Sequence, residues 1–308
     1  MDKVVWQKHQ GVSLGCVNDY NVIDCEACGF RHIVPIPSDE QLAVIYREEY
    51  YSKDKPDYFE SSRRDFDWWR MVYRERYQTF ESLLPEDHRR VIDVGSGPGF
   101  FLLEGKERGW QPQGIEPSRQ AAEHARDLGI PVVNDFLSST TMGQLPPSHV
   151  IHLSNVMEHI PNPIELLRIC HRLLLDNGLL AVVVPNDFNP FQQALLDACD
   201  FQPWWISPPH HINYFDFDSL QGLLERSGFE IVLRESTFPI DLFLLMGDNY
   251  VGNDSVGRAC HERRMRFEFN LETAGLSGVK RSLYQAMAQN NIGREIFFVA
   301  RKVRLADE

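Results

Sequence analysis

The sequence predicts an α/β fold with a mainly parallel sheet, and two observations support this. Residues 91–99 read Val-Ile-Asp-Val-Gly-Ser-Gly-Pro-Gly, an apolar run that carries an acid and leads into a tight glycine loop. Further strand-like apolar runs follow in order at 110–116, 130–133, 149–153 and 178–185. A glycine turn directly after the first strand is typical of a Rossmann-like sheet, in which the backbone closely approaches a bound cofactor.

The spacing of the glycine loop indicates which kind of cofactor it binds. Gly95, Gly97 and Gly99 alternate, and Phe100 stands where the dinucleotide fingerprint Gly-x-Gly-x-x-Gly has its third glycine. Asp93 lies just before the loop, where its charge would repel a diphosphate. Both departures disfavour a nicotinamide dinucleotide, which leaves a dehydrogenase as a weaker alternative.

The second predicted strand, 110–116, ends in an acid that suits a ribose. Glu116 follows the glycine loop by roughly twenty residues, the distance at which an acid reaches ribose hydroxyls in such folds. A carboxylate can accept two hydrogen bonds from a vicinal diol. We therefore expect Glu116 to bind a ribose, and the alternative is an exposed acid at the end of a strand.

A motif after the fourth predicted strand carries a family resemblance. Residues 154–161 read Ser-Asn-Val-Met-Glu-His-Ile-Pro, which resembles the "LEHIPDP" motif of ubiquinone-biosynthesis-type methyltransferases. The glycine loop likewise resembles the first motif of class I S-adenosylmethionine-dependent methyltransferases, and the matching landmarks extend over 91–233. The resemblance implies a seven-stranded Rossmann-like sheet, S-adenosylmethionine as the methyl donor, and Asp135 as the ligand of the adenine amino group.

The cofactor-binding residues implied by this resemblance lie in the glycine loop and at the ends of the following strands. They are Asp93, Gly95, Ser96, Gly97, Gly99, Phe100, Glu116, Pro117, Asp135, Phe136 and Asn155.

Histidines near the motif are candidates for the acceptor chemistry. A hydroxyl is a poor nucleophile until a base, most often histidine, removes its proton. His211, in Pro-Pro-His-His-Ile-Asn-Tyr-Phe, is the predicted base or acceptor-orienting residue, with His159 assisting and Tyr214 orienting the acceptor. The alternative for each histidine is a loop side chain whose hydrogen bonds are made by the backbone.

A cysteine pair near the N-terminus predicts a metal site. Cys25-Glu-Ala-Cys28-Gly is half of a zinc knuckle, His32 is a candidate third ligand, and His9 or Cys16 is a candidate fourth. The region resembles the N-terminal part of some sugar-modifying methyltransferases, although one of their two knuckles is missing. The alternative to structural zinc is a degenerate ribbon with buried free thiols.

The sequence divides into three predicted parts. Residues 1–45 form the knuckle-like region, 46–86 a helical cap or linker, and 87–308 the methyltransferase domain. Helices are expected at 38–51 and 63–84. Residues 236–291 form an insertion that shapes the acceptor site or a dimer contact. A last strand, 292–303, is expected to enter the sheet antiparallel to its neighbours.

Composition restricts the partners. Among 308 residues, 44 acids exceed 31 bases and give a formal charge of −13, which disfavours nucleic acid as a partner. We see neither an apolar run long enough to cross a bilayer nor a signal-peptide pattern, so we expect a cytoplasmic protein without membrane contact. A homodimer is a further expectation.

These observations together predict a methyltransferase that acts on a small-molecule hydroxyl, in a sugar or sugar nucleotide of polysaccharide or natural-product synthesis. A C-methyltransferase on a nucleotide-linked keto-sugar and a quinone-type O-methyltransferase are the rival enzymes. The alternative from another class is an S-adenosylmethionine-binding interaction protein.

Overall fold

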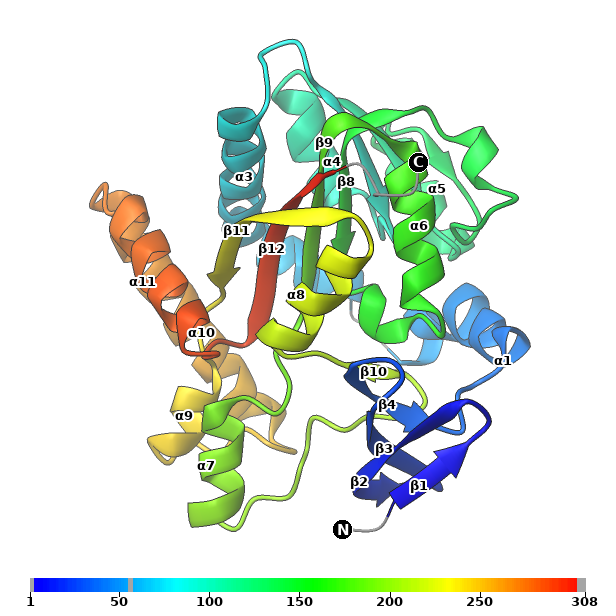
Figure 1. The fold of residues 1–308 in the computed structure, drawn as a ribbon. Helices are drawn as coiled ribbons and strands as arrows, with labels where there is room; N and C mark the ends of the chain where they lie inside the picture. The colour runs from blue at the N-terminus through cyan, green and yellow to red at the C-terminus, as the bar shows by residue number, and fades with distance from the viewer. Residues whose placement is uncertain (1–2, 55–57, 304–308) are drawn as a thin grey trace.

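The computed structural model describes residues 3–54 and 58–303, and its described strands form a seven-stranded and a five-stranded sheet (Figure 1). The predicted parts 1–45, 46–86 and 87–308 also include residues 1–2, 55–57 and 304–308, which lie outside the described residues.

The seven-stranded sheet confirms the predicted α/β fold. Its order is β11-β12-β9-β8-β5-β6-β7. The strands are β5 (Arg90–Val94), β6 (Gln111–Ile115), β7 (Val132–Val133), β8 (Ser148–Ser154), β9 (Leu174–Pro185), β11 (Phe229–Ser236) and β12 (Glu295–Lys302). β12 runs antiparallel to both β9 and β11, as predicted for the last strand.

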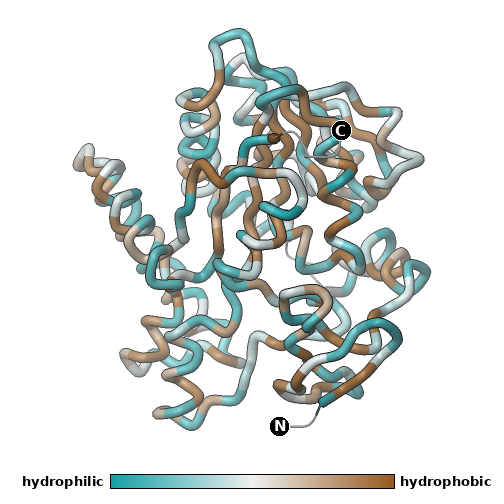
Figure 2. Tube along the Cα trace, viewed as in Figure 1, coloured by the Kyte–Doolittle hydropathy of each residue, from teal (hydrophilic) through white to brown (hydrophobic). Residues whose placement is uncertain are grey.

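Alternating apolar residues bury both faces of this sheet. Successive side chains of a strand point to opposite faces, and accordingly Ile92 and Leu180 belong to one core cluster while Val91 and Leu179 belong to another. The first cluster includes α6 (Pro163–Leu173) and α8 (Phe217–Arg226), and the second includes α3 (Phe66–Leu83), α4 (Phe100–Glu107) and α5 (Arg119–Asp127). Figure 2 shows the apolar strands running between these helices.

The five-stranded sheet joins the N-terminal region to a distant segment. Its order is β1 (Lys3–Trp6), β2 (His9–Val17), β3 (Tyr20–Cys25), β4 (Phe30–Val34) and β10 (Asn213–Tyr214). β10 pairs antiparallel with β4, and this pairing was not expected from the sequence. The two-residue strand β10 has too little apolar pattern to reveal itself as a strand.

The remaining helices flank the sheets. Ser38 caps α1 (Asp39–Val44) through a capping box, and a π-helix, η1 (Ile45–Asp54), continues it, so the helix expected at 38–51 has two parts. α2 (Tyr58–Arg64) precedes α3. The others are η2 (Met142–Gln144), η3 (Met157–His159), α7 (Pro190–Ala198), α9 (Asp241–Leu245), α10 (Asp254–Thr273) and α11 (Ser277–Gln289). Within the described ranges, every helix is too short or too polar to span a bilayer.

Close packing of α3 on α4 predicts a large stability difference between two glycine substitutions. A Cβ added at Gly105 of α4 would lie 2.2 Å from Oη of the fully buried Tyr77. Gly105→Ala should therefore lower the free energy of unfolding by about 1–3 kcal/mol, measured by urea denaturation. At Gly278 of α11 a Cβ would meet no described atom within 4 Å, so Gly278→Ala should cost nothing. Equal stability of the two variants would contradict this packing.

Candidate active site

A cavity of about 1350 Å³ lies at the carboxyl ends of the parallel strands. It is lined by the residues that follow β5, β6, β7 and β8, and by helical residues between 39 and 76. β6 lies on one side of β5 and β8 on the other, so the chain changes direction across the sheet at this point. Such a switch point is where open α/β sheets bind their ligands.

The glycine loop forms one wall of the cavity. The N–H of Gly95 donates to the carbonyl of Ile115 at 2.8 Å, and Gly95 has a φ of 67°. Gly99 has a φ of 86°, and a Cβ there would lie 2.7 Å from that of Ala125 in α5. Gly99 thus permits close helix packing rather than lining the cavity. The lining residues of the loop include Gly95, Ser96, Gly97 and Phe100.

Glu116 is fixed by the glycine loop that it faces. Its Oε2 accepts from the N–H of Gly97 at 2.8 Å and its Oε1 from the N–H of Ser118 at 2.9 Å. Burial, helped by the charge of Asp93 and opposed by these two bonds, raises the pKa of Glu116 to about 7. The carboxyl is therefore poised to lose its proton when a ligand supplies further donors. Pro117, next in the chain, also lines the cavity.

Asp93 belongs to a buried chain of hydrogen bonds. Its Oδ1 lies 2.7 Å from Nδ1 of His152, whose Nε2 lies 3.0 Å from Nη1 of Arg76. Arginine can only donate, so Nε2 of His152 accepts and its Nδ1–H donates to Asp93. Burial lowers the pKa of His152, which agrees with a neutral ring. The charge of Asp93 is thus stabilised inside the cavity wall.

The ends of β7 and β8 complete this side of the cavity. Oδ1 of Asp135 accepts from the N–H of Phe136 at 2.9 Å and from Nη2 of Arg47 at 2.6 Å. The guanidinium of Arg47 also lies 5.2 Å from the centre of the Phe136 ring. Asn155 follows β8 with a φ of 53°. Asp135, Phe136 and Asn155 all line the cavity.

Two histidines and a carboxyl group gather at another part of the cavity wall. The rings of His159 and His211 are 5.0 Å apart, and Oε1 of Glu158 lies 3.7 Å from Nε2 of His159. Nδ1 of His159 lies 2.7 Å from the carbonyl of His210 and 2.9 Å from the hydroxyl of Tyr46. Burial lowers the pKa of His159 to about 4 and raises that of Glu158 well above its ordinary value.

Tyr214 lies away from the cavity wall, unlike the sequence prediction that it orients the acceptor. Its side chain is fully buried, and its hydroxyl accepts from the N–H of Ser207 and donates to the carbonyl of His211. Nδ2 of Asn213 donates to the carbonyls of Met157 and Ile160. Tyr214 and Asn213 therefore hold the shape of residues 207–215, here called the acceptor loop.

Sequence reasoning assigned no role to several cavity residues. Glu158 stands within the motif quoted for His159, so its position in the motif was a usable signal. Arg47, Arg76 and Tyr46 come from the helical segments before the sheet, and only the fold brings them to the cavity.

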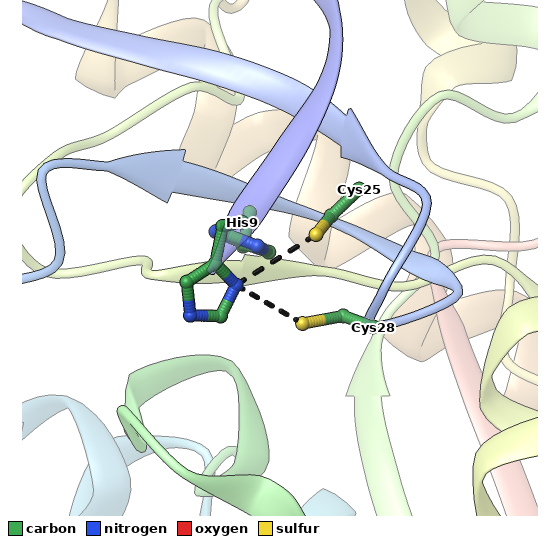
Figure 3. Close-up of side chains that lie close together, drawn as sticks. His9, Cys25 and Cys28 are labelled. Carbon is green, nitrogen blue, oxygen red and sulfur yellow. Dashed lines mark hydrogen bonds between the residues drawn. The ribbon is translucent and has the colours of Figure 1, made fainter. Parts of the chain in front are cut away.

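A second group of side chains meets between the strands of the N-terminal sheet. His9, Cys25, Cys28 and His32 have donor atoms that all lie within 4.8 Å of one another. Nδ1 of His9 lies 3.3 Å from Sγ of Cys28 and 3.7 Å from Sγ of Cys25 (Figure 3). We call these four residues the His₂Cys₂ group. Cys16, the other candidate ligand, is exposed and is not part of it.

The donor atoms of the His₂Cys₂ group are of the kinds that bind zinc. Nδ1 of His32 lies 2.9 Å from the carbonyl of Ile33, which leaves its buried Nε2 without a hydrogen-bond partner among the described residues. A ring held by one nitrogen with the other directed at the metal is typical of zinc ligands. Burial and the neighbouring Cys25 raise the pKa of the Cys28 thiol to about 12, so this thiol is protonated unless a cation draws off its proton.

Comparison with known proteins gives one family match. A family model described as a methyltransferase domain matches residues 60–234, more than half of the chain.

Two curated relatives share part of this range. A ubiquinone biosynthesis O-methyltransferase from Actinobacillus pleuropneumoniae serotype 7 (strain AP76) is 28% identical over 102 residues, covering 30% of this chain and 44% of that protein. The protein of that name from Caulobacter sp. (strain K31) is 26% identical over 136 residues, covering 41% and 53%. The chain thus matches about half or less of the length of these relatives.

A solved structure shows the same fold. The plantazolicin methyltransferase BamL, in complex with a triazolic desmethylPZN analog and SAH, matches with a TM-score of 0.51 and 16% identity, covering 85% of this chain and 94% of that chain. The family match includes the glycine loop, Glu116, His159 and His211. The chain therefore belongs to the methyltransferase domain family and has the class I S-adenosylmethionine-dependent methyltransferase fold.

Proposed function

We propose that the chain binds S-adenosylmethionine in the cavity and transfers its methyl group to a hydroxyl of a small molecule. One observation carries this proposal: the glycine loop with Glu116 and the Glu158, His159 and His211 group line the same cavity. Its volume of about 1350 Å³ exceeds the roughly 300–1,000 Å³ of ordinary ligand pockets. That volume suits a donor and an acceptor bound side by side.

The part of the cavity at the glycine loop and Glu116, here called the cofactor end, is assigned from its hydrogen-bonding capacity. Each oxygen of Glu116 uses one lone pair for a backbone N–H and keeps another for one hydroxyl of a ribose diol. Asp135 is assigned to the adenine amino group. The acids Asp93 and Glu116 suit a ligand that carries a sulfonium cation rather than a diphosphate.

The part of the cavity at Glu158, His159 and His211, here called the acceptor end, is assigned from the need for a base. The donor already carries its leaving group, so the protein aligns the two molecules and removes one proton. His211 accepts the hydroxyl proton while the oxygen attacks the methyl carbon, the S–CH₃ bond breaks, and S-adenosylhomocysteine leaves. Because its pKa is near 4, His159 remains neutral and orients the acceptor as a hydrogen-bonding partner.

A sugar or sugar nucleotide is the acceptor class that we favour. Polar side chains line the acceptor end, including Glu158, His159, Asn162, Ser207 and His211, and such a wall suits a molecule rich in hydroxyls. The likeness of residues 1–45 to the N-terminal region of sugar-modifying methyltransferases also supports it. Quinone O-methylation, keto-sugar C-methylation and binding without catalysis are the alternatives. Three expectations from the sequence remain predictions. They are that the protein does not bind nucleic acid, that it forms a homodimer and that it is cytoplasmic.

Labelled methyl transfer distinguishes these acceptors. The protein is mixed with methyl-labelled S-adenosylmethionine and separate fractions of sugar nucleotides, lipids with quinones, and RNA, and mass spectrometry locates the label. We expect label on an oxygen of a sugar nucleotide. Label on carbon or on a quinone would replace the acceptor, and cofactor binding without any transfer would favour the binding protein.

We also infer that the His₂Cys₂ group holds a structural Zn²⁺ ion. Two imidazoles and two thiolates form a closed tetrahedral set with no position left for a substrate. The support is the convergence of four donors from β2, β3, β4 and the turn between β3 and β4.

Glu116→Gln should weaken S-adenosylmethionine binding more than tenfold, which is about 1.4 kcal/mol or more. The amide would turn an N–H₂ group toward one of two backbone donors that now face carboxylate oxygens. Calorimetry measures the affinity, with Glu123→Gln as the control because Glu123 is exposed on α5. An affinity within twofold of wild type would remove Glu116 from the ribose site.

The affinity for S-adenosylmethionine should fall as pH drops from 8 to 6. Since burial raises the pKa of Glu116 to about 7, the carboxyl is protonated below that pH and must ionise to accept from both ribose hydroxyls. Part of this pH dependence should vanish in Glu116→Gln. Identical pH profiles of the two proteins in calorimetry would contradict the assignment.

His211→Ala should lower turnover by about 10²–10⁴-fold, the usual contribution of a general base, and leave cofactor affinity unchanged. Turnover is measured with the acceptor found by methyl labelling. His88→Ala is the control, because His88 stacks on His149 and does not line the cavity. Unchanged turnover in His211→Ala would assign proton removal to another group.

A further inference from the structure

Strand β10 connects the His₂Cys₂ group to the acceptor end of the cavity. We propose that a metal ion in this group positions the acceptor loop, so that metal occupancy controls the acceptor end and leaves the cofactor end unchanged. The proposal rests on the proposed function and on the proposed zinc ion. It assigns the N-terminal sheet a part in acceptor binding.

The first link is the pairing of β4 with β10. In this antiparallel pair, the metal-ligand candidate His32 lies opposite Asn213, and Arg31 lies opposite Tyr214. The N–H of Ile33 also donates to the carbonyl of Ile212 at 2.9 Å. His211 directly precedes this paired segment, so a displacement of β4 moves the backbone that carries the proposed base.

The second link fixes the same segment to the motif after β8. The N–H of Ile212 donates to the carbonyl of Glu158 at 2.7 Å, and Nδ2 of Asn213 donates to the carbonyl of Met157 at 2.8 Å. The acceptor loop is therefore held between β4 on one side and η3 on the other. Because His159 lies in η3, the spacing of His159 and His211 depends on both contacts.

Further contacts tie the β3–β4 turn and β4 to the region around α8. Nη1 of Arg31 donates to Oδ2 of Asp216, the cap of α8, at 2.8 Å. The rings of Phe30 and Phe215 are 5.2 Å apart. Nη2 of Arg226 donates to the carbonyl of Cys28, itself a member of the His₂Cys₂ group. The turn that carries this cysteine is thus attached to the catalytic domain rather than to its own sheet alone.

A metal ion would brace the face of the N-terminal sheet that carries the His₂Cys₂ group. On this face the buried apolar cluster is small and consists of Ile23, Cys25 and Val34. On the other face, Val22 and Ile33 join a larger buried cluster that includes Ile212 and Tyr214 of the acceptor loop. Small layers with few apolar side chains gain stability from metal ions, and the binding free energy of the metal adds to the folding free energy. A zinc ion would join three strands of the sheet through His9 of β2, Cys25 at the end of β3, and His32 of β4. Of these strands, β4 is the one that pairs with β10.

Hydrogen exchange of the full chain tests the coupling. Zinc-loaded protein and protein stripped with a chelator are compared by mass spectrometry, with zinc content measured in both. Without zinc, amides of 30–34 and of 212–214 should exchange at least about tenfold faster. Amides of 95–97 should be unchanged, and S-adenosylmethionine affinity should stay within twofold.

Variants separate the metal from other effects of the chelator. His9→Ala should lose zinc and reproduce the exchange pattern of stripped protein, whereas His9→Cys supplies another zinc ligand and should retain protection. Cys16→Ala is the matched control, because this exposed cysteine lies on β2 outside the His₂Cys₂ group. Once the acceptor is known, loss of zinc should lower kcat/KM for the acceptor and leave the affinity for S-adenosylmethionine unchanged.

Two results would overturn the proposal. One is that the full chain binds no zinc, and the other is that zinc removal exposes 30–34 while 212–214 stay protected. A failure of the proposed function is distinguishable, since it would abolish S-adenosylmethionine binding but leave the zinc-dependent protection of 212–214 intact.

Discussion

The change of chain direction beside β5 is the constraint on which the site depends. With β6 on one side of β5 and β8 on the other, the following loops diverge and leave a cavity at their carboxyl ends. The glycine loop, Glu116 and Asn155 all line that cavity because their strands end there. Helical segments that precede β5 in the sequence supply Arg47 and Arg76. These segments close the cavity, although they come before the part of the chain in which strands and helices alternate.

The cavity concentrates ionisable groups that burial makes costly. Burying a carboxyl group is costly unless hydrogen bonds or an opposite charge compensate it, and the protein compensates these groups unequally. Asp93 accepts a hydrogen bond from the neutral ring of His152, and Glu116 accepts two from backbone N–H groups. For Glu158, Oε2 has no hydrogen-bond partner in the described part of the chain. A buried carboxyl oxygen without a partner is expected in a binding site, where the bound ligand supplies the missing hydrogen bond.

Local sequence patterns predicted the sheet and much of the cavity, because strand runs, glycine spacing and the motif at 154–161 are contiguous signals. They did not predict β10, since two residues carry no periodicity and their partner strand lies at the other end of the chain. Tyr214 was misplaced for a related reason. A tyrosine in a histidine-rich loop suggests a ligand contact, but here its hydroxyl bonds to the loop backbone. His9 and Cys16 were equivalent in sequence, and only the strand register brings His9 to the two cysteines.

In the proposed reaction, one cavity holds the donor against Glu116 and directs its methyl group toward His159 and His211. A crystal structure of the protein with S-adenosylhomocysteine tests it most directly. We expect both ribose hydroxyls within hydrogen-bonding distance of the Glu116 carboxylate and the sulfur facing the two histidines. A product bound elsewhere, or with its sulfur directed away from the acceptor loop, would exclude this arrangement of donor and acceptor.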